Sequence, residues 1–302
     1  MGKTVFMFPG QGAQYVGMGK DFYEQIPVCK EMFELAGKAS GLDVAALCFE
    51  ENEQINITEY TQIAMLATEV AILKAVEEKG VKPDITGGLS LGEYGALVAS
   101  GVMSPEDAFK IVRKRGIYMQ EAVPQGGAMI AVLGLDTAVI EQICEETPGM
   151  VTIANYNCPG QIVITGEEGA AQAAMEKLTA AGAKRCVPLK VSGPFHSPLL
   201  TGAGEKLAKE LETVEIHDIA VPYIANVTAD YVKDKADVKP LLEKQVSSSV
   251  KWQQTVERMI ADGADTFIEI GPGKTLSGFM RKINRDVKVI NIEKVEDLQK
   301  LL

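Results

Sequence analysis

Residues 84–99, Asp-Ile-Thr-Gly-Gly-Leu-Ser-Leu-Gly-Glu-Tyr-Gly-Ala-Leu-Val-Ala, contain the pattern that decides the fold. Residues 84–88 read as a short strand, and residues 93–99 read as a helix. Between them, Gly88-Leu89-Ser90-Leu91-Gly92 fits G-x-S-x-G, in which a sharp strand-to-helix turn exposes a serine hydroxyl at the top of a sheet. The pattern predicts an α/β fold with Ser90 as nucleophile. A glycine-rich turn without chemistry is the alternative that the pattern alone leaves open.

The segments on either side of this turn alternate between strand and helix patterns. We expect strands at residues 4–8, 84–88, 221–225, 266–270 and 287–292, and helices at residues 62–79, 105–122 and 252–262. Strands separated by helices indicate a parallel sheet that is covered on both faces.

The middle of the chain has a different order of elements. Strands are expected at residues 128–133, 151–155, 161–165 and 186–191, with helices at 137–146 and 169–181. This β-α-β-β-α-β order is the ferredoxin-like pattern. Turn-rich stretches at 124–127 and 192–194 bound it. We therefore expect a small inserted domain, residues 125–196, in a large α/β domain formed by residues 1–124 and 197–302.

Composition excludes several classes of function. The net charge of −11 argues against nucleic acid as the main partner. Five scattered cysteines and two histidines predict neither a disulfide framework nor a zinc site, and no metal or other cofactor is expected. The chain shows no signal peptide and no apolar run of the roughly 18 residues that span a bilayer, so we expect a cytoplasmic protein without a membrane partner.

A serine nucleophile needs a base, and the chain has only two histidines to offer. His196 lies in a loop stiffened by Pro194 and Pro198, and such rigidly held loops concentrate catalytic groups. His217 lies in a charged stretch and is expected in solvent. The context favours His196 as the base. No acidic residue stands out as its orienting partner, and a backbone carbonyl can fill that role.

Arg115 interrupts the apolar face of a predicted helix. Ser104 and Asp107 form a capping box at its start. The apolar stripe that follows consists of Ala108, Ile111, Val112, Met119 and Ala122, and Arg115 falls on it. A buried guanidinium needs an anion. Two interpretations stay open: a structural salt bridge to an Asp or Glu, and a clamp for a substrate carboxylate.

Six blocks of sequence resemble one enzyme family. They are Phe8–Gly12, Gly88–Tyr94, Arg115-Gly116 with Met119–Pro124, Asn155–Asn157 with Pro159–Gln161, Gly193–Ser197, and Glu269–Gly273. In this order, and over nearly the whole chain, they are similar to bacterial malonyl-CoA:acyl carrier protein transacylases. The resemblance implies a hydrolase-like α/β domain with a ferredoxin-like insert.

The resemblance also implies roles for individual residues. Ser90 would be the nucleophile, His196 the base and Arg115 the ligand of the malonyl carboxylate. The backbone amides of Gln11 and Leu91 would form the oxyanion hole, and the main-chain carbonyl of Gln245 would orient the histidine.

Two positions next to these residues also compare with the family, and one of them bears on selectivity. Phe195 resembles the malonyl-selective version of the histidine loop. Many family members have a histidine directly before the serine, where this chain has Leu89. That position is not part of the implied machinery, so only the local polarity beside Ser90 differs.

The implied reaction is a ping-pong transfer of malonyl from coenzyme A to the phosphopantetheine thiol of acyl carrier protein, in fatty acid or polyketide synthesis. A serine hydrolase or thioesterase would share Ser90 and His196 but gives no reason for Arg115. A carrier-binding module without catalysis is a third possibility, and it predicts no acylation at all.

Carrier proteins of this kind are acidic, as is this chain, so their encounter requires a local basic patch. The sequence offers two clusters, each expected near the mouth of the active site. Their residues are Lys184, Arg185 and Lys190 in the first, and Lys274, Arg281, Lys282 and Arg285 in the second.

Overall fold

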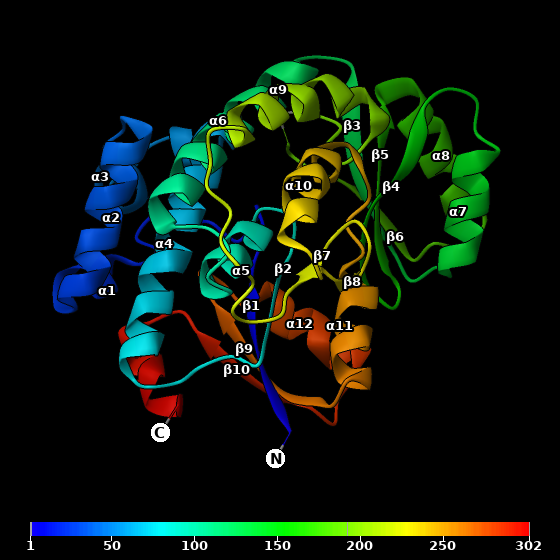
Figure 1. Cartoon of the computed structure of the whole chain (residues 1–302). Coiled ribbons are helices and arrows are strands. Elements are labelled where there is room, and N and C mark those ends of the chain that lie inside the picture. Colours follow the sequence, from blue (N-terminus) through cyan, green and yellow to red (C-terminus); the bar gives the residue numbers. More distant parts are fainter. Residues whose placement is uncertain (1, 192, 302) are drawn as a thin grey trace.

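A four-stranded parallel sheet forms the centre of the protein, described here by a computed structural model of residues 2–191 and 193–301 (Figure 1). Its strand order is β10-β9-β1-β2. All three pairings are parallel, as the sequence predicts. The strands are β1 (Lys3–Phe8), β2 (Ile85–Gly88), β9 (Ala264–Ile270) and β10 (Lys288–Ile292). The predicted α/β class with a parallel sheet is confirmed.

The strand expected at residues 221–225 is not part of this sheet, and that prediction was wrong. Only β7 (Ile224–Ala225) forms there, and it pairs antiparallel with β8 (Asp230–Tyr231). Tyr223 adds a single bridge to Thr86 of β2. Pro222 has no N–H to donate, so this segment cannot extend a ladder along β2.

Helices cover the sheet on both faces, and the largest layer is built on α4 (Figure 1). α4 packs against α6 and α2, and α9 packs against α6. α4 begins four residues before the predicted start and is buried on nearly every side. The helices of this part are α1 (Lys20–Gln25), α2 (Pro27–Ser40), α3 (Val44–Phe49), α4 (Thr58–Glu78), α5 (Gly92–Ala99), α6 (Pro105–Ala122), α9 (Thr201–Leu211), α10 (Val238–Ser247), α11 (Trp252–Ala261) and α12 (Thr275–Ile283).

A second sheet, drawn in green in Figure 1, is antiparallel with the order β4-β5-β3-β6. It has an apolar cluster of its own, centred on Val132, Ile140 and Ile164. Ser192, in the turn predicted to end this region, lies outside the described residues. The elements are β3 (Gly127–Leu133), α7 (Thr137–Glu145), β4 (Val151–Cys158), β5 (Gln161–Glu167), α8 (Glu168–Ala180) and β6 (Arg185–Pro188).

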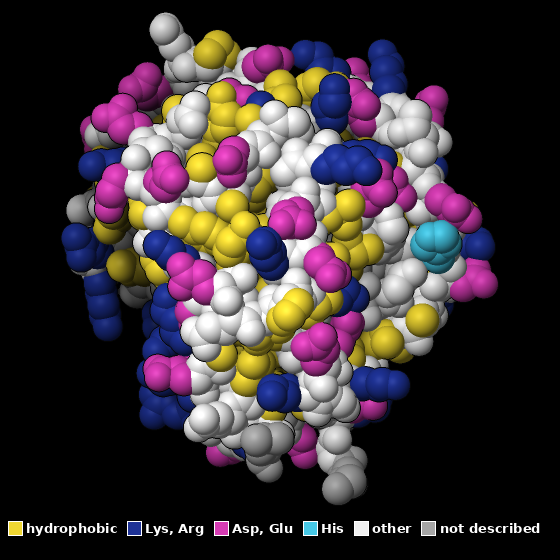
Figure 2. All heavy atoms as spheres, turned by 90° about the vertical axis from the view of Figure 1, so that its left-hand side faces the viewer, with side chains coloured by type: hydrophobic (Ala, Val, Ile, Leu, Met, Phe, Trp, Pro, Cys, Tyr) yellow, Lys and Arg dark blue, Asp and Glu magenta, His cyan; other side chains and the backbone are white. Residues whose placement is uncertain are grey.

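The surface that carries α1, α2 and α3 shows acidic and basic side chains interspersed over most of its area (Figure 2). Within residues 2–191 and 193–301, no helix combines the length and apolar character needed to cross a bilayer. The same residues contain no group of three or more His, Cys, Asp or Glu side chains placed to hold a metal ion.

A buried carboxylate joins α12 to the end of the sheet. Glu269, in β9, is fully buried and accepts hydrogen bonds from Leu276 N (2.9 Å), Ser277 N (2.8 Å) and Ser277 Oγ (2.5 Å). These amides lie in the first turn of α12, where helical N–H groups have no partner within the helix. The negative charge is also attracted to the positive end of the α12 dipole, which lies at this end of the helix.

We expect Glu269→Ala to lower the free energy of unfolding by about 2 kcal/mol or more, because buried amide donors lose a charged acceptor. Urea denaturation measures the change. Glu257→Ala, an exposed carboxylate on α11, is the matched control and should leave the midpoint nearly unchanged. Equal midpoints for both variants would show that Glu269 does not anchor α12.

Candidate active site

Ser90 lies in a strained turn between β2 and α5, with φ of 55°. A Cβ on Gly88 would come within 1.9 Å of the Gly92 carbonyl oxygen, and a Cβ on Gly92 within 2.1 Å of the Phe8 carbonyl oxygen. Only glycine fits at both positions, so the flanking glycines allow the turn. A non-glycine residue in the left-handed region is characteristic of functional sites. The predicted strand–turn–helix elbow is confirmed.

Asn226 holds this turn from outside. Its Oδ1 accepts a hydrogen bond from Ser90 N (2.6 Å), and its Nδ2 donates one to the Gly88 carbonyl (2.6 Å). Sequence reasoning missed this residue. Its place directly after the run at 221–225 is the signal that could have found it, because polar side chains at the carboxyl ends of strands gather at active sites.

His196 is the histidine next to Ser90. Ser90 Oγ lies 2.7 Å from His196 Nε2, and His196 Nδ1 lies 2.8 Å from the Gln245 main-chain oxygen. A carbonyl only accepts, so Nδ1 carries the proton and the Nε2 lone pair faces the serine hydroxyl. His217 is exposed beside Glu215, as expected. The structure thus places His196, and not His217, beside Ser90, with the Gln245 carbonyl on the other side of the ring.

The environment keeps the His196 imidazole neutral. Burial lowers its pKa to about 4, and the positive charge of Arg115 adds to this effect. At neutral pH the ring is therefore free to accept the serine proton, which is the state that a general base requires.

The Arg115 guanidinium is buried, with 1 % of the residue exposed, and lies beside Ser90. Its Nη1 donates to Gln62 Oε1 (2.7 Å), and its Nη2 donates to Gln245 Oε1 (3.0 Å) and Ser90 Oγ (3.2 Å). Throughout the described part of the chain, no Asp or Glu forms an ion pair with it. The structural salt bridge, which the sequence left open, is thus contradicted.

Glu93 is a carboxylate whose charge acts on Arg115, but its hydrogen bonds go to other groups. Its Oε2 accepts from Gln245 Nε2 (2.6 Å) and Asn226 N (3.2 Å). Burial raises the Glu93 pKa to about 7, although these bonds and the charge of Arg115 oppose the rise. Near neutral pH its charge is only partial, so it compensates Arg115 incompletely. The sequence contains no signal for this role beyond the position of Glu93 after the elbow.

Gln245 is fully buried and contacts four other residues of the site. Its main-chain oxygen holds His196, and its side chain reaches Arg115, Glu93 and the Ser90 carbonyl (2.9 Å). The resemblance assigned it only the main-chain contact. The side-chain contacts are additional, and they come from a helix 155 positions from the serine.

A cavity of about 720 Å³ opens over these groups. Among the described residues, the main-chain amides of Gln11 and Leu91 have no acceptor within the protein, and both residues line the cavity. They can therefore stabilise an oxyanion beside Ser90. The rest of the wall is largely apolar and includes Met119, Met129, Ala131, Val163, Leu189, Val191, Phe195 and Phe279. The structure thus brings Ser90, His196, Arg115, Gln11, Leu91 and Phe195 together around one space.

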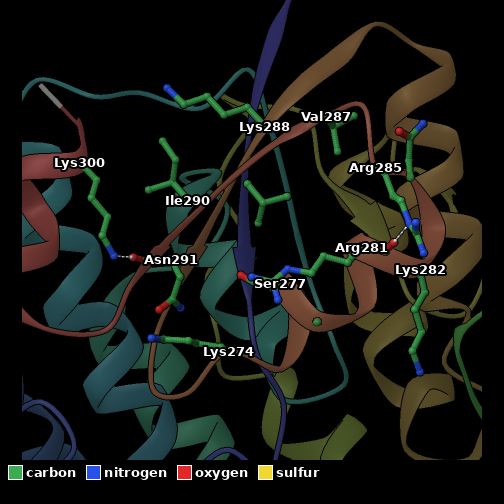
Figure 3. Close-up of a pocket in the computed structure, with 13 residues that line it drawn as sticks. Lys274, Ser277, Arg281, Lys282, Arg285, Val287, Lys288, Ile290, Asn291 and Lys300 are labelled. Carbon is green, nitrogen blue, oxygen red and sulfur yellow. Dashed lines mark hydrogen bonds between the residues drawn. The ribbon is translucent and has the colours of Figure 1, made fainter.

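The two basic clusters do not meet at one mouth. Lys190 lines the active-site cavity, and Lys282 Nζ donates to Gln161 Oε1 (3.2 Å), which lines it as well. Lys274, Arg281, Lys282 and Arg285 line a separate cavity of about 980 Å³ between α12 and β10 (Figure 3). Lys184 and Arg185 lie at the start of β6, outside both linings.

Comparison with known proteins agrees with this geometry. A family profile described as "Acyl transferase domain" matches residues 5–297. The chain belongs to this acyl transferase family. It is 46 % identical to the malonyl CoA-acyl carrier protein transacylase of Bacillus subtilis (strain 168), over 99 % of this chain and 96 % of that protein.

Solved structures of acyl transferases have the same fold. The crystal structure of malonyl CoA-acyl carrier protein transacylase from Clostridium perfringens has a TM-score of 0.95 at 46 % identity, covering 99 % of this chain and 96 % of that one. A malonyl-transacylase in complex with a type II PKS acyl-carrier protein has a TM-score of 0.96 at 38 % identity, covering 99 % of each chain.

For this acyl transferase we expect the acid limb of the pH profile of kcat/KM for acylation of Ser90 near pH 4. The His196 pKa is lowered, so the neutral base is present above that value and is lost as the pH falls through it. In Arg115→Met this acid limb should move to higher pH, because the positive charge that helps to lower the His196 pKa is removed. Rapid-quench acylation after a brief pH jump measures both profiles. A wild-type limb near 6.5 would contradict this assignment.

Proposed function

We propose that this chain transfers a malonyl group from coenzyme A to the phosphopantetheine thiol of an acyl carrier protein, through an ester on Ser90. The observation that carries the proposal is the buried Arg115, which has no carboxylate partner in the described chain and lies 3.2 Å from Ser90 Oγ. An acyl group with a terminal carboxylate supplies the missing anion. The relatives' names describe this same reaction.

In the first half-reaction, Ser90 Oγ attacks the malonyl thioester carbon while its proton passes to His196 Nε2. The amides of Gln11 and Leu91 stabilise the oxyanion. The C–S bond then breaks, and coenzyme A leaves as a thiol with the proton from His196. In the second half-reaction the carrier's thiol loses its proton to His196 and attacks the ester, which returns the hydroxyl to Ser90.

Arg115 distinguishes this reaction from the alternatives. A serine hydrolase or thioesterase would use the same Ser90–His196 pair, but an uncharged acyl group would leave the guanidinium without a counterion. A carrier-binding module would need neither the hydrogen-bonded pair nor the unoccupied amides. The transferase uses all of these groups, with no metal or redox cofactor, and we place it in the cytoplasm.

The domain division is part of the same proposal. We assign residues 1–124 and 197–302 to a hydrolase-like domain and residues 125–196 to a ferredoxin-like insert. The separate apolar cluster and the sheet order β4-β5-β3-β6 support the division. The cavity has walls from both parts, with Ser90 and Arg115 on one side and Met129 and Val163 on the other.

Basic side chains near the cavity are proposed to receive the acidic carrier protein. Lys190 is exposed and lines this cavity, and Lys282 is exposed and donates to Gln161 of its lining. The second cavity adds Lys274, Arg281 and Arg285, and its described lining contains no carboxylate (Figure 3). Lys184 and Arg185 would extend the positive field along β6. In a chain of net charge −11, such a local patch is what steers an acidic partner.

Arg115→Ala should reduce malonylation of Ser90 by roughly 100-fold or more, since a buried charge-assisted carboxylate pair is lost, and should reduce acetylation far less. Intact-protein mass after rapid mixing with malonyl-CoA or acetyl-CoA measures both adducts. Ser90→Ala, which should form neither, is the control. An equal fall for both acyl groups would show that Arg115 is structural.

The double reversal Arg185→Glu with Lys282→Glu changes two exposed cations outside the lining of the active-site cavity. It should slow malonyl transfer to the carrier while leaving acylation by malonyl-CoA nearly unchanged. The defect should shrink as salt is added, because screening weakens the lost attraction. Lys30→Glu with Lys38→Glu on α2 makes the same change of charge on another exposed surface and is the control. If transfer at low salt is equal in both variants, the carrier docks elsewhere.

A further inference from the structure

We propose that Gln62 is a specificity-determining residue, because its neutral amide holds the Arg115 guanidinium in place without neutralising it. The cation then remains available for the carboxylate of the acyl group. The inference rests on the proposed function and adds to it a residue that neither the sequence nor the resemblance singled out.

Gln62 is well placed to orient Arg115. It lies near the start of α4, is 1 % exposed and lines the active-site cavity. Its Oε1 accepts from Arg115 Nη1 at 2.7 Å. α4 and α6 pack tightly against each other, so both ends of this contact are on rigid elements. The guanidinium plane is thereby held before any substrate arrives.

The surroundings of the Gln62 amide nitrogen show that a carboxylate would also fit at position 62. Arginine only donates, so the amide oxygen must face it. The nitrogen, Nε2, lies 3.4 Å from Met119 Sδ, and a thioether is a weak acceptor. No strong acceptor therefore requires a nitrogen at this position. A glutamate of the same shape would keep the bond to Arg115 and add a charge to it.

The other partners of Arg115 are neutral too. Gln245 contributes an amide oxygen and Ser90 a hydroxyl. The Gln245 amide also stands between Arg115 and Glu93, since its two ends bond to one each. Arg115 Nε is buried and has no acceptor among the described residues. The positive charge is thus retained beside Ser90, and one donor of the guanidinium stays unused.

This arrangement selects acyl groups in two ways. A carboxylate in the cavity pairs with the guanidinium through charge-assisted hydrogen bonds. An acyl group without one leaves the cation desolvated and unpaired, which is unfavourable. A glutamate at position 62 would place a permanent imitation of the substrate carboxylate inside the protein. It would stabilise the fold and remove the reason to prefer malonyl.

The test compares Gln62→Glu with Gln62→Met, which has nearly the same shape and no charge. Rapid mixing and intact mass give the rates at which malonyl-CoA and acetyl-CoA acylate Ser90, and thermal denaturation gives Tm. For Gln62→Glu we expect the malonyl-to-acetyl ratio to fall roughly 100-fold, with Tm above that of the wild type, because the buried cation gains a counterion.

For Gln62→Met we expect the ratio to stay within about tenfold of the wild-type value, since the charge of Arg115 is untouched and only its positioning is weakened. Tm should not rise. This result separates the charge at position 62 from the simple loss of a hydrogen bond.

Three outcomes would overturn the inference: a Gln62→Glu variant that keeps the malonyl preference, one that is less stable than the wild type, or a Gln62→Met variant that loses the preference as completely as Gln62→Glu. The proposed function fails separately, if the wild-type protein forms no malonyl ester on Ser90.

Discussion

The Arg115 guanidinium carries a positive charge inside the protein, where the described residues provide only amides and a hydroxyl as hydrogen-bond partners. Burying a charge without a counterion is unfavourable, so the surrounding structure must hold it there. The packing of α4 on α6 does this from one side and α10 from the other. Arg115 therefore lacks the stabilisation that an ion pair with a carboxylate would give. Its charge remains available to an anion next to Ser90.

Gln245 makes the positions of Ser90, His196 and Arg115 depend on one another. One residue accepts from His196 with its main chain and contacts Arg115 and the Ser90 carbonyl with its side chain. A shift of α10 would therefore move the imidazole and the guanidinium together. Asn226 adds a second constraint, since it bonds to both sides of the elbow. Catalytic groups held in this way lose little freedom when a substrate binds.

The net charge of the protein and the local charges near its cavities act on a partner in opposite directions. The net charge of −11 disfavours an acidic partner at long range, whereas the cations around α12 and Lys190 form a local positive field. Inside the cavity, the buried Arg115 is the cation that we propose selects the acyl group. In the proposed docking, long-range repulsion and local attraction together would favour encounters near these cations over encounters elsewhere on the surface.

The sequence alone predicted the elbow, the serine at its tip and the histidine that lies beside it, because these follow from local sterics and from elimination. Two glycines flank Ser90 where no side chain fits, and only one of two histidines lies in a rigid loop. The helical period likewise placed Arg115 on a buried face. Only the tertiary structure decided whether a carboxylate meets Arg115 there, and it corrected the strand at 221–225. Gln62 and Asn226 are 53 and 136 positions from the residues they hold. Contacts over such separations depend on the packing of whole elements, which leaves no local pattern in the chain.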